Sequence, residues 1–148
     1  MKIEDALAGV SRIFLDTSPV IYYVESNLAY YDLVKVIFDR IDAGSLAAVT
    51  SPITLSECLV APYRLGLSAV QQNFLDLIVS GHDTTFVHIN HDSARQAAEL
   101  RVPHNLTLLD ALQVGVALGV GCDALLTNDV TLRRVTELRV IVLDDMEI

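Results

Sequence analysis

A repeated alternation of short apolar runs and longer helical segments constrains the fold of this chain more than any other feature of its sequence. The apolar runs lie at residues 12–16, 46–50, 84–89, 124–127 and 140–143. They lack the alternation of apolar and polar residues that a half-exposed strand shows. Continuous apolar strands separated by helices are typical of a parallel sheet that is buried on both faces. The sequence therefore predicts an α/β fold.

The segments between these runs carry apolar residues at helical spacing. Helices are expected at residues 27–44, 53–64, 68–81, 91–102, 107–120 and 129–136. Ser18 and Ser51 each precede a proline, so each is expected to cap a helix whose first residue is that proline. Pro103 is expected to end the helix that begins at His91.

Length and composition fit one compact domain over residues 1–148. Of these residues 52% are hydrophobic, and the mean hydropathy is +0.44. A chain of this length buries a sizeable core without cross-links. Cys58 and Cys122 lie far apart, without the spacing of a zinc site or a disulfide framework. We therefore expect a protein of the reducing cytoplasm.

Charge argues against export, membrane insertion and binding of nucleic acid by bulk attraction. Glu4 and Asp5 stand where a signal peptide requires positive charge. The longest apolar stretch, residues 106–126, contains Asp110, Gln113 and Asp123, which would be costly in lipid. The net charge of −9 is the wrong sign for an extended nucleic-acid surface. Any role on nucleic acid must come from a local site.

Four acidic residues stand out by their positions. Asp16 follows the first apolar run and Asp129 follows the fourth, at the carboxyl edge of a parallel sheet, where ligands collect. Glu57 and Asp110 lie within helices, and their neighbours three and four positions away are largely apolar. Both side chains are therefore expected to face inward, where an unpaired carboxylate costs several kcal/mol. A divalent cation such as Mg²⁺ or Mn²⁺, which takes oxygen ligands, would remove that cost.

Each acid also has a purely structural explanation. Asp16 could bond the turn that follows its strand, and Asn128 or Asp129 could cap the short helix that comes next. Asp110 fits a capping box that begins at Thr107.

Glu57 fits a similar box that begins at Thr54, but this explanation is weaker. Ser51 is the stronger helix start, and it would push Glu57 into the second turn of the helix, too deep for capping. The case for a functional site therefore rests on the four acids taken together.

Four segments of the chain together resemble the PIN-domain ribonucleases, and among these the VapC-type toxins of toxin–antitoxin systems. They are residues 14–20 (FLDTSPV), 51–57 (SPITLSE), 109–112 (LDAL) and 125–129 (LLTND). The resemblance runs from about Arg12 to Leu143. It implies a three-layer α/β/α sandwich with a five-stranded parallel sheet in the order 3-2-1-4-5, and endonucleolytic cleavage of RNA that depends on Mg²⁺ or Mn²⁺.

The resemblance also implies roles for particular residues. The residues that would bind the metal, directly or through water, and act in catalysis are Asp16, Glu57, Asp110 and Asp129. Those that would donate hydrogen bonds around them are Thr17, Ser18, Thr127 and Asn128. A small antitoxin whose tail enters the acidic groove and a second copy of the chain are the implied protein partners.

Two other functions remain open at this stage. An aspartyl phosphotransfer domain also places an aspartate after its first strand, but it needs a nearby lysine, and the chain has only Lys2 and Lys35. A PIN-like scaffold without activity, which only binds a partner, is the second alternative. Retention of all four acids argues against it.

Overall fold

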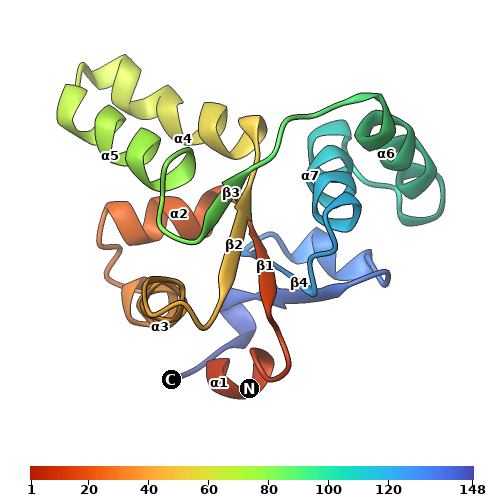
Figure 1. Ribbon diagram of the computed structural model, residues 1–148, viewed down its shortest axis with the longest axis horizontal. Coiled ribbons are helices and arrows are strands. Elements are labelled where there is room, and N and C mark those ends of the chain that lie inside the picture. The colour runs from red at the N-terminus through yellow and green to blue at the C-terminus, as the bar shows by residue number, and fades with distance from the viewer.

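The computed structural model describes every residue from Met1 to Ile148, and its centre is a sheet of five parallel strands in the order β3-β2-β1-β4-β5 (Figure 1). The strands are β1 (Arg12–Leu15), β2 (Ala47–Thr50), β3 (Thr84–Phe86), β4 (Ala124–Thr127) and β5 (Arg139–Val142). The fold class and strand order implied by the resemblance are confirmed.

Seven α-helices and two 3₁₀ helices surround the sheet. They are α1 (Ile3–Ala6), α2 (Thr17–Val24), α3 (Tyr31–Asp42), α4 (Pro52–Leu65), α5 (Ser68–Ile78), α6 (His91–His104), α7 (Leu108–Gly119), η1 (Val130–Arg134) and η2 (Leu143–Asp145). None of the helices is long and apolar enough to cross a membrane.

Two apolar clusters lie on opposite faces of the sheet, because successive side chains of a strand point to opposite sides. Ile13 and Leu15 of β1 belong to the cluster under α2, α3 and α5, and Phe14 belongs to the cluster under α6 and α7. All three side chains are at most 2% exposed. Helices therefore cover both faces, as Figure 1 shows with α2 and α3 on one side and α7 on the other.

Several predicted element boundaries are wrong. The helix expected from Ser18 begins at Thr17, and Asp16 occupies its N-cap position without a capping hydrogen bond from its side chain. The helix expected at residues 27–44 is shorter, because residues 27–30 form a turn in which the Asn27 side chain accepts the backbone N–H groups of Ala29 and Tyr30. The N-terminal helix α1 was not expected at all.

Pro103 does not end α6, which continues to His104. A proline in the last turn removes only one hydrogen bond, and Asn105 in the left-handed conformation closes the helix. The third strand is also shorter than expected, and the segment at 129–136 is a 3₁₀ helix over Val130–Arg134.

The strand register decides which residues meet at the carboxyl edge of the sheet. Leu15, the last residue of β1, pairs with Leu126 of β4. The Asp16 backbone N–H then donates to the Leu126 carbonyl at 3.0 Å. Asp16 and Thr127, 111 positions apart in the chain, are thereby brought side by side.

Candidate active site

Asp16 is the buried centre of the acidic site. Its residue is 9% exposed, and each of its carboxylate oxygens accepts a hydrogen bond from a buried side chain. Thr127 Oγ1 donates to Oδ2 at 2.7 Å, and Gln113 Nε2 donates to Oδ1 at 3.5 Å. Both donors hold the carboxylate at the end of β1.

Burial raises the pKa of Asp16 above its ordinary value, and the nearby charge of Glu57 acts in the same direction. Hydrogen bonds from Thr127, from the backbone of Thr17 and from Gln113 oppose this effect but do not cancel it. A buried carboxylate with a raised pKa and an acidic neighbour is a frequent property of functional sites.

Glu57 lies on α4 and is exposed, which corrects the expectation that it faces inward. The buried residues of α4 are Ile53, Thr54, Cys58 and Pro62, so Glu57 lies beside this buried stripe rather than within it. Thr17 Oγ1 donates to Glu57 Oε1 at 2.7 Å and turns the carboxylate towards the start of α2.

Asp110 lies in the first turn of α7 and is half-buried. Its backbone N–H donates to Thr107 Oγ1 at 3.3 Å, which is one half of the predicted capping box. The reciprocal bond from the Thr107 backbone to the Asp110 carboxylate is absent, so the capping box is only half formed. Burial raises the pKa of Asp110, Thr107 lowers it, and the charges of Asp129, Asp16 and Glu57 raise it further.

Asp129 follows β4 and caps η1. Its Oδ1 accepts from the Thr131 backbone at 2.9 Å and from Thr131 Oγ1 at 2.8 Å, as the capping explanation predicted. The Asp129 backbone N–H also donates to Thr127 Oγ1 at 2.9 Å, and Thr127 in turn binds Asp16. Capping occupies only one oxygen of the Asp129 carboxylate, and Oδ2 has no hydrogen-bond partner.

Two of the four residues expected to donate hydrogen bonds to the acids do so. Thr17 binds Glu57 and Thr127 binds Asp16. Asn128 does not, because its Nδ2 donates to the Tyr22 hydroxyl at 3.2 Å and its Oδ1 accepts from the Asp144 backbone at 2.9 Å. The Ser18 side chain makes no hydrogen bond to any of the four carboxylates.

The four carboxylates are close enough for their charges to interact, but they do not form a closed cage. No group of three or more histidine, cysteine, aspartate or glutamate side chains is arranged so that it could hold a metal ion. Mutual repulsion between anions explains this separation. The donor set nevertheless fits Mg²⁺ or Mn²⁺, because it consists of hard oxygen ligands and because Mg²⁺ usually keeps several waters beside one or two carboxylates.

Gln113 is the member of the site that sequence reasoning missed. It is 1% exposed and lies one turn after Asp110 on α7. The sequence does contain a feature that could have identified Gln113: it is a polar residue on an otherwise apolar helix face, three positions after the candidate ligand Asp110.

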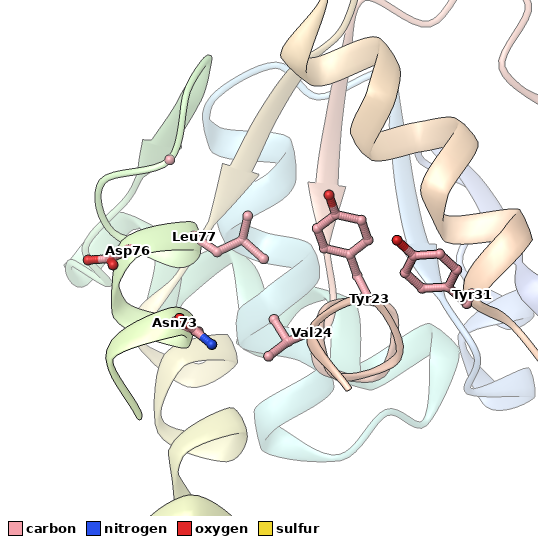
Figure 2. Close-up of a pocket in the computed structure, with 7 residues that line it drawn as sticks. Tyr23, Val24, Tyr31, Asn73, Asp76 and Leu77 are labelled. Atoms are coloured by element: carbon pink, nitrogen blue, oxygen red, sulfur yellow. The ribbon is translucent and has the colours of Figure 1, made fainter. Parts of the chain in front are cut away.

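A separate pocket of about 450 Å³ lies between α2, α3 and α5. Tyr23, Val24, Tyr31 and Leu77 supply its apolar lining, as Figure 2 shows. Its one carboxylate, Asp76, accepts a hydrogen bond from Gln72. None of the four candidate acids lines this pocket, so it is not the acidic site.

The fold is an α/β/α sandwich built on an open parallel sheet. Four carboxylates, two from strand ends and two from helices, lie at one edge of that sheet, and together these features define the class of the protein. The sequence pattern of the PIN domain matches residues 13–138. This match spans most of the chain, which therefore belongs to the PIN domain family.

Solved structures of similar fold come from bacterial toxin–antitoxin systems. VapBC2 from Rickettsia felis, bound to a DNA fragment from its promoter, aligns with a TM-score of 0.67 and 18% identity over 88% of this chain and 98% of that one. FitAcB from Neisseria gonorrhoeae aligns with a TM-score of 0.67 and 15% identity over 90% and 99% of the two chains.

VapC20 from Mycobacterium tuberculosis, described as a toxin that cleaves the sarcin–ricin loop, aligns with a TM-score of 0.60 and 22% identity over 76% of this chain and 86% of that one. A comparison with curated protein sequences found no significant match. These identities establish a shared fold.

Proposed function

We propose that this protein is a metal-dependent endoribonuclease and the toxin of a toxin–antitoxin pair. The observation that carries the proposal is the buried Asp16 carboxylate beside three further carboxylates, from α4, α7 and the end of β4, at one edge of a PIN-domain sheet. PIN domains are generally nucleases, and one neighbour of similar fold is described as an RNA-cleaving toxin.

In the proposed mechanism, a Mg²⁺ or Mn²⁺ ion would be held, directly or through water, by the four carboxylates of Asp16, Glu57, Asp110 and Asp129. The ion, when bound, lowers the pKa of a coordinated water and offsets charge on the scissile phosphate. Thr17 holds the Glu57 carboxylate, and Thr127 holds that of Asp16. One of the four carboxylates would accept the proton of the attacking water.

Two protein partners belong to the proposal. A small antitoxin is supported by neighbours solved as toxin–antitoxin complexes, including one from Klebsiella pneumoniae. We expect its tail to enter the acidic groove. A homodimer is the second expectation, and analytical ultracentrifugation of the chain alone would test it.

The two alternative functions have less support. No lysine lies near Asp16, because Lys35 pairs with Asp39 on α3 and Lys2 bonds the carbonyl of Ile148. This disfavours a phosphotransfer domain. A scaffold without activity has no need for a buried carboxylate with acidic neighbours, which costs stability.

The test is single-turnover cleavage of a pool of hairpin RNAs with randomised loops. We expect cleavage in Mg²⁺ or Mn²⁺, loss of cleavage in EDTA and recovery when the metal is returned. An acyl phosphate formed at Asp16 from acetyl phosphate, without RNA cleavage, would support the phosphotransfer domain instead. Neither reaction, from a folded chain, would support the scaffold.

A further inference from the structure

Gln113 is a buried amide at the centre of a polar network beneath the acidic site. Its side chain lies on α7, among apolar neighbours that are fully buried, such as Val114 and Ala117. A buried amide must satisfy its donors and its acceptor inside the protein, or lose stability. Every polar atom of Gln113 does find a partner, and those partners lie at the end of β1 and at the start of α4.

The amide of Gln113, on α7, contacts Asp16 at the end of β1 and two residues at the start of α4. Its Nε2 donates to Asp16 Oδ1 at 3.5 Å and to Thr54 Oγ1 at 2.8 Å. Its Oε1 accepts from Ser51 Oγ. Glu57 lies one turn beyond Thr54 on α4, and Asp110 lies one turn before Gln113 on α7. One side chain thus connects the elements that carry three of the four acids.

The two partners at the start of α4 also make hydrogen bonds to groups other than Gln113. Thr54 Oγ1 already donates to the Leu15 carbonyl at 3.0 Å, and Ser51 Oγ already accepts the N–H groups that begin α4. Asp16 Oδ1, by contrast, has no other side-chain donor. The Ser51 hydroxyl likewise has Gln113 Oε1 as its only acceptor, so the amide completes the hydrogen bonds of both Ser51 and Asp16.

We propose that Gln113 is a positioning residue that fixes the Asp16 carboxylate and sets its separation from the acid-bearing helices α4 and α7, so that these carboxylates can take up a divalent cation together. This inference rests on the proposed function. It assigns to Gln113 the part of an outer hydrogen-bonding partner, whose loss typically lowers metal affinity by about 10- to 100-fold.

The test compares Gln113→Met with Val116→Ala, using Mn²⁺ as the probe. Methionine keeps the length and shape of glutamine but removes its donor and acceptor. Val116 is buried on the same helix and packs in the apolar cluster, so its truncation serves as a control for lost stability. Mn²⁺ affinity is measured by electron paramagnetic resonance, and stability by urea unfolding.

We expect Gln113→Met to weaken Mn²⁺ binding at least about 10-fold, and Val116→Ala to leave it within about twofold at a comparable loss of stability. In single-turnover cleavage the Gln113→Met defect should shrink as Mn²⁺ is raised, because added metal compensates for weaker binding. Equal Mn²⁺ affinity in Gln113→Met and wild type would overturn the proposal.

A second measurement decides the matter even if Gln113→Met does not fold or if the wild-type chain binds no Mn²⁺. In the protein without metal, the Gln113 side-chain amide protons should exchange slowly and should shift in Asp16→Asn. Exchange as fast as that of the exposed Gln72 amide would contradict the inference. Slow exchange together with a wild type that binds no metal and cleaves no RNA would instead contradict the proposed function alone.

Discussion

Thr127 Oγ1 lies 2.7 Å from Asp16 Oδ2 and donates a hydrogen bond to it, while the same hydroxyl accepts the backbone N–H of Asp129 at 2.9 Å. One buried threonine therefore connects two candidate ligands from neighbouring strands, β1 and β4. A hydroxyl that accepts from one side and donates to the other keeps its proton directed at Asp16.

This relationship predicts that Thr127→Val destabilises the protein. Valine has the shape of threonine but leaves Asp16 Oδ2 without its donor, and an unsatisfied buried acceptor costs about 1–3 kcal/mol. Thr127→Ser, which keeps the hydroxyl, should lose less. Urea unfolding at neutral pH measures both variants, and a larger loss in Thr127→Ser than in Thr127→Val would show that packing of the methyl group, not the hydrogen bond, is what matters.

Removing the charge of Asp110 should abolish activity without unfolding the protein. In Asp110→Asn the backbone bond to Thr107 remains, while repulsion from Asp129, Asp16 and Glu57 disappears. We expect single-turnover RNA cleavage to fall by about 10² to 10⁴-fold, with a stability in EDTA equal to or above that of wild type. Asp5→Asn, which changes an exposed acid in α1, is the charge-matched control and should keep full activity.

Asp16→Asn should abolish cleavage in the same way, again with a fold at least as stable as wild type in EDTA. Marked unfolding of both the Asp16 and the Asp110 variants would instead favour purely structural roles for these acids.

Stability in the absence of metal should depend on pH with a definite sign. The pKa values of Asp16 and Asp110 are raised in the folded chain, so above the ordinary aspartate value of about 4 the folded state binds more protons than the unfolded state. The contribution of these two aspartates to the free energy of unfolding therefore falls as pH rises from about 4, the ordinary aspartate pKa, through their raised pKa values.

The measurement is thermal and urea unfolding in EDTA from pH 4 to pH 8, for wild type and for Asp16→Asn with Asp110→Asn. The double variant should gain stability relative to wild type as pH rises, and the gain should level off above the raised pKa values. Comparison with the variant cancels the other acids, including Asp123, whose pKa is lowered by backbone hydrogen bonds from Ser11 and Arg12. A difference that does not change with pH would contradict the prediction.

Thr17 should matter for activity more than for stability. Its hydroxyl holds the exposed Glu57 carboxylate at 2.7 Å, so Thr17→Val frees that carboxylate to rotate. We expect cleavage to fall by about 10-fold, the low end for an outer partner of a metal ligand, and the free energy of unfolding to change by less than about 0.5 kcal/mol. Thr17→Ser keeps the hydroxyl and should cleave at close to the wild-type rate. If Thr17→Ser is as slow as Thr17→Val, the hydrogen bond to Glu57 does not explain the loss.

The strands, most of the helices and the edge of the sheet at which the acids gather could all be predicted from the sequence. These features follow from local patterns: apolar runs such as residues 13–15, which are buried on both faces of the sheet, and polar residues that stand directly after them. Parallel pairing then places Asp16 and Asp129 at the same edge, and the resemblance to PIN domains supplied the strand order that makes β1 and β4 neighbours.

The tertiary structure alone decided how the side chains at that edge are oriented. Glu57 is exposed although its sequence neighbours are apolar, Asn128 binds Tyr22 and Asp144 rather than the acids, and Gln113 supports Asp16. Each of these outcomes depends on contacts between residues that are distant in the chain, 97 positions apart for Gln113 and Asp16. Hydrophobic periodicity determines which face of an element is buried, but a hydrogen bond depends on the position of its partner, and only the packed fold sets that position.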